Sequence, residues 1–349
     1  MDPLTDLELR IGRLPRVPLA HLPTPLERLP RFSESLGGPQ VWIKRDDCTG
    51  LAMGGNKTRH NEFLMADAVE ENADLVVWGA GVQSNNCRQT AASCAKLGFA
   101  CHLLLSRGGH GHEIQGNLLL DHILGASYEI VDELVGPELD ERIARTAQLF
   151  RDRGRKVYSW DRSTVKAKAA ISYSQCLIEI TRQFESQEIE PAALYICSGG
   201  STGAGLALAG KILQITYPIQ NILPIHWPWD EQQDLSQIAN AAADLLEHPE
   251  RVLPEEINID GTYVGEGYGI PTDECMEATQ LLARTEGILL DPSYTGKAMA
   301  GLIDHVRSGR YAADQHVIFV HTGGTPALFA GADNLATMLT PAEKPRTAP

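Results

Sequence analysis

Three short runs of apolar residues, each followed at once by a glycine-rich turn, constrain the fold of this chain most strongly. The runs are LVVW at 75–78, LYIC at 194–197 and VIFV at 317–320, and the turns after them begin GAG, SGGSTG and HTGG. Strands that are apolar without alternation are typical of parallel sheets covered by helices on both faces. Because helical patterns separate these runs, we predict an α/β fold with mainly parallel sheets.

The glycine-rich turns also predict one ligand site, because ligands of open α/β sheets bind beyond the carboxyl ends of the strands. Further strands are expected at 41–44 and 101–105, and helices at 84–97 and 204–210. Residues 224–233, with two Trp and two Pro, are expected to form an irregular loop. The three turns are therefore expected to lie around a single small molecule.

The charge and hydropathy patterns exclude several classes of partner. The 349 residues include 30 Lys and Arg against 45 Asp and Glu, a net charge of −15, and no basic tract is present. Nucleic acid is therefore not expected as a partner. No apolar run approaches the roughly 18 residues of a membrane span, and the first residues lack the basic and apolar stretches of a signal peptide. We expect a cytoplasmic protein that does not bind a membrane.

The seven cysteines predict neither disulfide bonds nor a zinc site. Their number is odd and none has CxxC spacing, which is typical of reduced thiols in a cytoplasm. His110 and His112 have no Cys or acidic residue at ligand spacing, so we interpret this segment as a loop. No metal ion is expected.

The first candidate for chemistry is the segment MGGNKTR at 53–59. Its two glycines let the backbone approach a ligand closely, and Lys57 directly behind them can present its amine there. Lysine is the side chain that forms a Schiff base with an aldehyde cofactor. The alternative is a turn followed by an exposed helical lysine.

The second candidate is GAGVQSNN at 79–86, which places Gln83, Ser84 and Asn85 at the start of a predicted helix. Free N–H groups and the helix dipole at such a position favour an anion, for example a substrate carboxylate. Ser84 or Asn85 can also simply cap the helix. The two roles are compatible, so the site hypothesis stands beside the capping one.

The third candidate is SGGSTGAG at 198–205. Its successive backbone N–H groups, with the hydroxyls of Ser201 and Thr202, can form a phosphate cup. A dinucleotide fingerprint is one alternative, but it needs an acidic residue about 20 positions later, and the stretch around Gln220 has none. A nucleophile elbow is the other, because GGSTG fits G-x-S-x-G and Asp291 and His321 follow in the order of α/β-hydrolases.

The remaining candidates supply hydroxyl groups. Tyr294, in LDPSYTGK at 290–297, can act as an acid or base, or it can be a packed residue with a bonded hydroxyl. Tyr268 lies in the glycine-rich segment GEGYG at 265–269. Thr322 follows a predicted strand, and its hydroxyl can hydrogen-bond a pyridine nitrogen without forcing the protonation of that nitrogen.

Taken together, these segments resemble the family of D-cysteine desulfhydrase and 1-aminocyclopropane-1-carboxylate (ACC) deaminase, which are pyridoxal-phosphate (PLP) enzymes. The resemblance spans about residues 20–332 and is specific, because several independent motifs occur in the same order. The motifs are GGNK at 54–57, QSN at 83–85, the turn at 199–203, Tyr268, DPSYTGK at 291–297 and HTGG at 321–324. The segments 21–29, 45–51 and 263–272 also resemble the L-cysteate sulfo-lyase branch.

The resemblance implies a tryptophan-synthase-β-like fold (PLP fold type II), with two three-layer α/β domains and PLP as the cofactor. It implies that Lys57 carries the internal aldimine and that Asn56 hydrogen-bonds the phenolic oxygen of the cofactor. Thr322 is expected to face the pyridine nitrogen. The phosphate is expected to lie against Gly199, Gly200, Ser201 and Thr202.

The resemblance also implies where the substrate lies. Ser84 and Asn85 are expected to hold its carboxylate, with Gln83 beside them, and Tyr268 and Tyr294 are expected to line the opposite side. Ser84 and Tyr294 are the candidate acid or base groups.

Three departures from the family pattern alter the expected substrate site. The usual Arg-Lys-Leu-Glu is here RHNE at 59–62, the usual Ser-Asn-His is SNN at 84–86, and a Gly-Gly-Ser-Asn loop near 162–166 is replaced by RSTVK. The deaminase branch has Glu in place of Thr295 and Leu in place of Thr322. Because a carboxylate at the pyridine nitrogen makes a deeper electron sink than a hydroxyl, this pair argues for β-elimination and against opening of a cyclopropane ring.

We therefore predict a PLP-dependent lyase that performs β-elimination on a small amino acid such as D-cysteine or L-cysteate and gives pyruvate and ammonia. Arg162 or Lys166 is expected to pair with an anionic β-substituent such as a sulfonate. Four alternatives stay open: an ACC-type deaminase, a family member with a divergent substrate, a serine α/β-hydrolase using Ser201, and a binding protein with little turnover.

The expected organisation places the cofactor in the cleft between two α/β domains. The larger domain is expected to hold residues 1–59 and 172–340 and the smaller one residues 60–171. Residues 341–349 are expected to be a disordered tail. The family suggests a homodimer.

Overall fold

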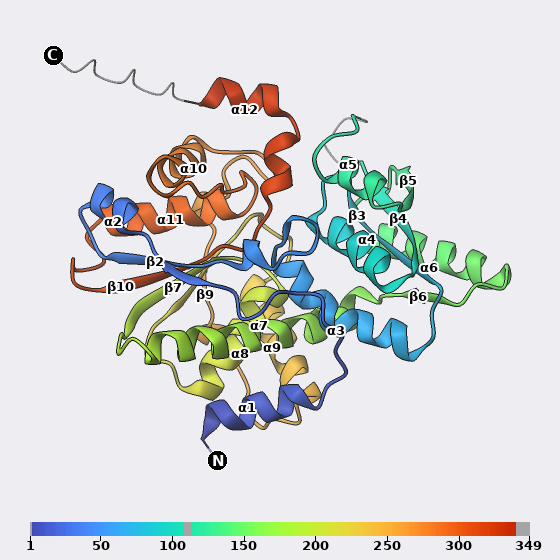
Figure 1. Ribbon diagram of the computed structural model, residues 1–349, viewed down its shortest axis with the longest axis horizontal. Helices are drawn as coiled ribbons and strands as arrows, with labels where there is room; N and C mark the ends of the chain where they lie inside the picture. Colours follow the sequence, from blue (N-terminus) through green and yellow to red (C-terminus); the bar gives the residue numbers. More distant parts are fainter. Residues whose placement is uncertain (1, 108–112, 340–349) are drawn as a thin grey trace.

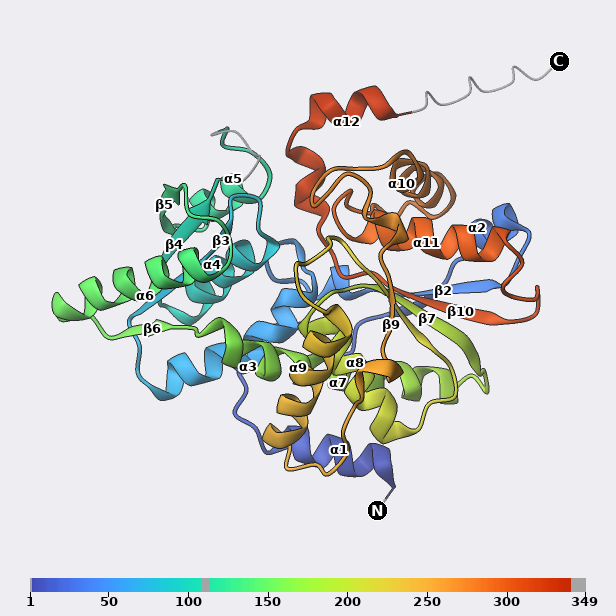
Figure 2. The same ribbon diagram turned by 180° about the vertical axis from the view of Figure 1, so that it is seen from behind.

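The computed structural model describes residues 2–107 and 113–339 and shows two separate sheets. One has six strands in the order β1-β2-β10-β7-β8-β9, and the other has four in the order β5-β4-β3-β6. Within the described residues, every strand pair is parallel except β1 with β2. Each sheet and its helices form one lobe of the molecule (Figure 1), and the same division is visible from behind (Figure 2). The predicted α/β fold with mainly parallel sheets is confirmed.

The six-stranded sheet is covered by helices on both faces. Its strands are β1 (Leu26–Arg28), β2 (Gln40–Lys44), β7 (Pro191–Cys197), β8 (Ile219–Ile222), β9 (Asn258–Asp260) and β10 (His316–Val320). Its helices are α1 (Pro3–Gly12), α2 (Pro30–Leu36), α7 (Arg162–Glu185), α8 (Ser201–Leu213), α9 (Glu231–Leu245), α10 (Asp273–Glu286) and α11 (Thr295–Arg307). Along β7, Leu194 and Ile196 pack with α1, α7, α8 and α9, while Ala193 and Tyr195 pack with α2, α10 and α11. This arrangement explains why the strand residues are apolar without alternation.

The four-stranded sheet has its own core. Its strands are β3 (Leu75–Gly81), β4 (Ala100–Ser106), β5 (Ser127–Val131) and β6 (Val157–Ser159), and its helices are α4 (Asn85–Leu97), α5 (Gly116–Ile123) and α6 (Pro137–Asp152). The prediction that the strand ends at residue 78 is wrong, because β3 continues to Gly81. A Cβ on Gly79 would lie 2.6 Å from the carbonyl oxygen of Leu104 and 3.0 Å from Cδ1 of Ile143. Glycine here serves close packing in the middle of a layer rather than the end of a strand.

Two helices connect the two sheets. In α3 (Asn56–Glu70), Phe63 belongs to the core of the larger sheet, whereas Leu64 and Met65 belong to the core of the smaller one. The other connecting helix, α7, begins at Arg162, so the segment 162–166 is its first turn rather than a loop. We propose that the two sheets are the cores of two domains. The proposed boundaries at 59/60 and 171/172 fall inside α3 and α7.

Shorter elements complete the described chain. They are the short 3₁₀ helices η1 (Asp46–Cys48), η2 (Leu51–Met53), η3 (Pro254–Glu256), η4 (Thr262–Val264) and η5 (Thr325–Phe329), and the last helix, α12 (Ala332–Met338). The expected irregular loop at 224–233 ends earlier than predicted, because α9 begins at Glu231. The predicted tail 341–349 and the pair His110 and His112 lie outside the described residues. Within 2–107 and 113–339, no helix is both long and apolar enough to cross a membrane.

A buried network of four charged side chains anchors the first turn of α3. Arg59 donates to both carboxylate oxygens of Asp46, at 2.9 and 2.8 Å, and to both of Glu179 in α7, at 2.7 and 2.8 Å. Lys44, at the end of β2, donates to Glu179 at 2.8 Å. The two positive and two negative groups balance, so burial leaves no net charge in the network.

Asp46 is the centre of this network. Its carboxylate also accepts hydrogen bonds from the hydroxyls of Tyr173 and Thr24, each at 2.7 Å. Burial alone would raise the pKa of Asp46, but Arg59 and Lys44 hold that pKa below its usual value. The backbone carbonyl of Asp46 accepts from the N–H of Gly55 at 3.0 Å. The network therefore fixes the backbone two residues before Lys57.

We expect Arg59→Met to lower the free energy of unfolding by about 3–5 kcal/mol, because it leaves the carboxylates of Asp46 and Glu179 buried without their main partner. The matched control is Arg182→Met, which removes an exposed ion pair with Glu8 and should cost about 1 kcal/mol or less. Urea unfolding followed by tryptophan fluorescence measures both. Equal losses in the two variants would contradict the role given to the network.

Candidate active site

The turn before Lys57 is built from two glycines whose backbone lies in the left-handed region, with φ of +64° at Gly54 and +116° at Gly55. A Cβ on Gly54 would lie 1.9 Å from the carbonyl oxygen of Asp47, so a larger residue does not fit. The next N–H, that of Asn56, donates to the carbonyl oxygen of Thr322 at 3.0 Å. The start of α3 therefore lies against the turn after β10.

Lys57 lies close to the turn before α8. Its Nζ is 3.5 Å from Nδ1 of His60, and Nε2 of the same imidazole is 3.4 Å from Oγ1 of Thr202. Asn56 also donates to Oγ1 of Thr202, at 3.0 Å. The structure thus brings together Lys57, Asn56 and Thr202, three of the residues proposed from the sequence. His60 also belongs to this group, although the sequence predicted no role for it beyond its departure from the family pattern.

The environment of Lys57 raises the unprotonated fraction of its amine. Lys57 is half-buried, and burial lowers its pKa to about 8. His60 is fully enclosed, and burial together with the positive charges of Lys57 and Arg59 holds the pKa of its imidazole well below the usual range. His60 is therefore neutral at neutral pH and can accept or donate one hydrogen bond at each ring nitrogen. A lysine with a lowered pKa in such a site is suited to attack an aldehyde.

The turn before α8 has the features of an anion site. Gly200 precedes the first helical residue, Ser201. As a glycine, it has no side chain that could cap this end of the helix. The hydroxyl of Ser198 accepts from the N–H of Gly203 at 2.8 Å. Ser201 and Thr202, between these two residues in the sequence, supply further N–H groups. A Cβ on Gly200 would meet nothing within 4 Å, so open space borders the turn. Gly199, Gly200, Ser201 and Thr202 therefore fit a phosphate group.

Thr322 and Thr295 have different surroundings. Thr322 is buried at the end of β10, where its carbonyl holds Asn56. The hydroxyl of Thr295 donates to Oδ2 of Asp291 at 2.7 Å and accepts from the backbone N–H of Asp291 at 2.8 Å. The hydroxyl of Thr295 is thus used within the cap of α11. Thr322 is the residue proposed to direct a hydroxyl at the pyridine nitrogen.

The alternative of a serine hydrolase is wrong. The carboxylate of Asp291 accepts from the backbone N–H groups of Ser293, Tyr294 and Thr295 at 2.8–2.9 Å, so it caps α11. Nε2 of His321 faces the carbonyl oxygen of Leu289 at 3.0 Å, and its Nδ1 accepts from the N–H of Gly323 at 3.2 Å. Asp291 and His321 are thus engaged elsewhere and do not activate Ser201.

Ser84 caps α4, as one of the two readings of this segment predicted. Its Oγ accepts from the backbone N–H groups of Asn86 and Cys87 at 3.1 and 3.2 Å. Because the oxygen accepts both bonds, the hydroxyl hydrogen of Ser84 remains available to donate. Asn85 follows, and its Oδ1 accepts from Arg88 and Asn117 at 3.2 and 3.1 Å. Ser84 and Asn85 therefore lie at the helix start that was proposed to hold a carboxylate.

The side-chain amide of Gln83 makes two hydrogen bonds at the start of α5. Its Oε1 accepts from the backbone N–H of Asn117 at 2.9 Å, and its Nε2 donates to the carbonyl oxygen of Gln115 at 3.0 Å. Both ends of the amide thus hold the start of α5. Gln83 thus positions α5 beside the turn, and its proposed contact with the substrate stays a prediction.

Tyr268 and Tyr294 form a pair. Their hydroxyl oxygens are 2.5 Å apart, and their rings lie edge to face with centroids 5.6 Å apart. Lys297, fully buried in α11, donates to the carbonyl oxygens of Val264 and Gly267 at 2.6 and 2.8 Å and so holds the loop that carries Tyr268. Burial, with Tyr268 close by, raises the pKa of Tyr294. The hydroxyl of Tyr294 therefore stays protonated at neutral pH.

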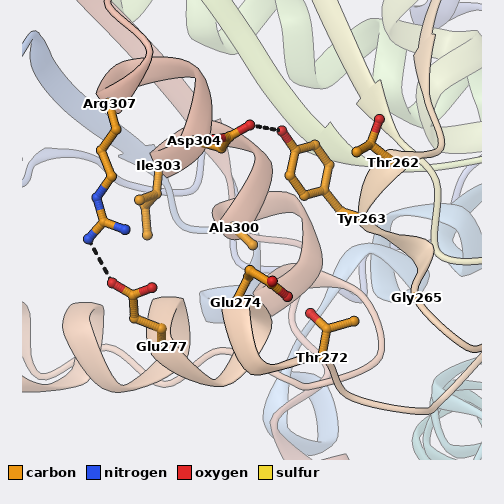
Figure 3. A pocket seen from close by; sticks show the side chains of 10 residues that line it. All are labelled: Thr262, Tyr263, Gly265, Thr272, Glu274, Glu277, Ala300, Ile303, Asp304 and Arg307. Carbon is orange, nitrogen blue, oxygen red and sulfur yellow. Dashed lines mark hydrogen bonds and ion pairs between the residues drawn. The ribbon is translucent and has the colours of Figure 1, made fainter.

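A surface pocket of about 330 Å³ lies beside the same loop (Figure 3). Four of its polar groups form two pairs: the hydroxyl of Tyr263 donates to Asp304 at 2.6 Å, and Arg307 donates to Glu277 at 2.7 Å. None of the residues proposed for catalysis or cofactor binding lines it. This pocket is distinct from the candidate active site.

Two buried charged groups behind the turn at Ser84 were not predicted. Arg88 and Asp121 are both fully buried, and burial lowers the pKa of Arg88 to about 10 and raises that of Asp121 to about 8. Nε of Arg88 and both carboxylate oxygens of Asp121 have no hydrogen-bond partner in the described part of the chain. Asp121 is therefore mostly neutral at pH 7.

Comparison with known proteins agrees with this geometry. The family model described as pyridoxal-phosphate dependent enzyme matches residues 17–323. The chain belongs to the pyridoxal-phosphate dependent enzymes. A crystal structure of an ACC deaminase homologue is 32% identical, with a TM-score of 0.86, and the match covers 96% of this chain and 99% of that one. The processed form of threonine deaminase isoform 2 from Solanum lycopersicum is 17% identical, with a TM-score of 0.63 over 96% and 88% of the two chains, and shares the fold.

Membership of the pyridoxal-phosphate dependent enzymes confirms four of the predictions. The family suggested by the motifs, the tryptophan-synthase-β-like fold and PLP as the cofactor are all supported. The chain is an enzyme, a PLP-dependent lyase or deaminase. The individual roles given to Lys57, Asn56, Ser84, Tyr268 and Tyr294 stay predictions.

We expect Asp121→Asn to make folding stability less dependent on pH. The folded-state pKa of about 8 lies above the ordinary value of 3.8, so Asp121 supports the fold fully below about pH 4 and loses this contribution as pH rises to 8. The asparagine variant should therefore gain stability relative to the wild type between these pH values, and the gain should level off above pH 8. Urea unfolding at a series of pH values measures the difference. A constant difference across this range would contradict a raised pKa for Asp121.

Proposed function

We propose that this enzyme removes a β-substituent from a small amino acid such as D-cysteine or L-cysteate and releases pyruvate and ammonia. The observation that supports the proposal most is the position of the Lys57 amine, which is separated from Thr202 of the glycine turn only by the imidazole of His60. This arrangement gives an aldehyde cofactor a lysine to bond and its phosphate a turn to rest against. PLP, when bound, supplies a ring that withdraws electrons from the α carbon of the substrate.

The residues of this chain hold the cofactor through separate groups. Lys57 supplies the amine, and its lowered pKa keeps a useful fraction of it unprotonated near neutral pH. Gly199, Gly200, Ser201 and Thr202 supply N–H groups and hydroxyls for the phosphate. The side chain of Asn56, which donates to Thr202, would contact the cofactor oxygen, and the hydroxyl of Thr322 would contact the ring nitrogen.

Other groups hold the substrate and give a proton to its leaving β-substituent. The amide nitrogen of Asn85 and the N-terminus of α4 offer donors to its carboxylate. Ser84 has a hydroxyl hydrogen free to donate to the same carboxylate or to move a proton. Tyr294, a protonated phenol at neutral pH, would give a proton to the leaving β-substituent. Tyr268 orients Tyr294 through the contact between their hydroxyls.

The surroundings of Lys166 favour a neutral β-substituent such as a thiol over a sulfonate. Lys166, proposed from the sequence as a partner of an anionic group, donates instead to Asp234 at 3.1 and 3.3 Å. Its charge is thus compensated within the chain. Arg162, the other residue proposed for this role, is the first residue of α7. We therefore rank cysteine before cysteate.

A second candidate is the opening of a cyclopropane ring, because the chain resembles an ACC deaminase homologue over nearly its whole length. The products distinguish the two reactions. β-Elimination from cysteine gives pyruvate, ammonia and sulfide, whereas hydrolytic opening of ACC gives a four-carbon keto acid and ammonia. Thr322 favours β-elimination, because it has a hydroxyl where the deaminase branch has an apolar side chain.

The experiment that tests this proposal is a substrate panel with the PLP-loaded enzyme. The panel holds D- and L-cysteine, cysteate, chloroalanine, serine and ACC, and the keto acid is identified by chromatography after derivatisation. We expect pyruvate from a cysteine enantiomer, and we expect Tyr294→Phe to lower kcat by about 10²-fold because the proton donor is lost.

The matched control for the panel is Tyr311→Phe, which removes a hydroxyl that contacts Tyr195 outside the site, and it should leave kcat unchanged. A four-carbon keto acid from ACC with no pyruvate from any other member of the panel would replace β-elimination by ring opening. No keto acid from any member would contradict both reactions.

A further inference from the structure

We propose that Arg88 is a positioning residue that sets the affinity of the site for the substrate carboxylate, by holding Asn85 and the loop before Lys57 with one guanidinium group. The inference rests on the proposed function, because it concerns the same site. It adds a residue that none of the sequence motifs had assigned to the site.

The contacts of Arg88 join three segments. From the first turn of α4, its Nη2 donates to the carbonyl oxygen of Gly54 at 2.8 Å. Its Nη1 donates to Oδ1 of Asn85 at 3.2 Å and to Oδ1 of Asn117, in α5, at 3.1 Å. Arg88 is fully buried, so water does not compete for these bonds. One side chain therefore fixes the turn at Ser84 and Asn85, here called the carboxylate turn, relative to the carbonyl of Gly54, three residues before Lys57.

The same contacts orient the amide of Asn85. Its Oδ1 also accepts from Nδ2 of Asn117 at 3.1 Å, and the second hydrogen-bond partner of that Nδ2 is the carbonyl oxygen of Gln83, at 2.9 Å. With two donors on its oxygen, Asn85 must direct its nitrogen away from Arg88. That nitrogen is a donor on the first residue of α4, which follows Ser84 in the chain. Loss of Arg88 would remove one of the two bonds that fix this orientation.

The charge of Arg88 favours an anion at this turn. In the described part of the chain, its hydrogen bonds all go to neutral oxygens, those of Gly54, Asn85 and Asn117. The acidic group that influences its pKa is Asp121, which is mostly neutral at pH 7 because burial raises the pKa of Asp121. A buried positive charge without an ion-paired partner attracts a carboxylate through the polarised amide of Asn85 more strongly than a neutral cap would.

Gln89 offers a matched comparison. Its Nε2 donates to the carbonyl oxygens of Gly54 and Leu51 at 2.7 and 2.9 Å, so it holds the same loop. No hydrogen bond is described between Gln89 and Asn85. A variant of Gln89 therefore disturbs the loop before Lys57 without removing a donor from the carboxylate turn.

The test is a titration of the PLP-loaded enzyme with alanine, as each enantiomer, and with ethylamine, which is alanine without its carboxylate. The visible absorbance of the bound cofactor reports binding of both. In Arg88→Met we expect alanine to bind about tenfold more weakly or worse, the effect of losing a charged hydrogen-bond partner, while ethylamine binds within about twofold of wild type. Arg88→Lys should recover part of the alanine affinity, since it keeps the charge.

Two further variants complete the design. Gln89→Met should change alanine and ethylamine binding by the same factor. If Arg88→Met does not fold, Asn117→Ala makes the same comparison, because it removes the other donor to Asn85. Equal weakening of alanine and ethylamine in the Arg88 or Asn117 variant, or unchanged binding of alanine, would overturn the proposal. A wild type that binds alanine yet forms no keto acid from any member of the substrate panel would contradict the proposed function and leave this result valid.

Discussion

The buried ion network of Arg59, Asp46, Glu179 and Lys44 is the interaction on which the rest of the structure depends. Four charges can be enclosed together only because each has a partner of opposite sign, and removal of one leaves another without compensation. The network joins β2, α3 and α7, and through the carbonyl of Asp46 it holds Gly55. The glycine turn, and with it the position of Lys57, is thus set by buried electrostatics rather than by the turn alone.

Contacts extend from the segment that this network holds toward both sheets. Toward the larger sheet, Asn56 and His60 reach Thr202, which places the lysine beside the turn before α8. Toward the smaller sheet, Arg88 and Gln89 of α4 donate to the carbonyl of Gly54. The proposed site needs such contacts in both directions, because its proposed cofactor residues and carboxylate-binding residues belong to different sheets. The neutral His60 and the lowered pKa of Lys57 are consequences of enclosing the amine there.

Local patterns predicted the parts of this site that depend on local structure. The strands at 194–197 and 317–320, the cap at Ser84 and the glycine turn before Lys57 are properties of short segments, and the structure contains each of them. Gly79 misled the prediction because its reason is the approach of Leu104 and Ile143, which are distant in sequence. The hydroxyl of Thr295 and the amide of Gln83 are used by neighbouring elements, and a list of polar residues does not show which partner each will choose. Arg88 and Lys297 were missed for the same reason, since their bonds reach other segments.

The most direct test of this account is to identify the lysine that carries the cofactor. The PLP-loaded protein is reduced with borohydride, digested and analysed by mass spectrometry for the peptide that gains the pyridoxyl group. The account predicts modification at Lys57 and nowhere else. Modification at another buried lysine, such as Lys44 or Lys297, or no modification at all, would contradict it.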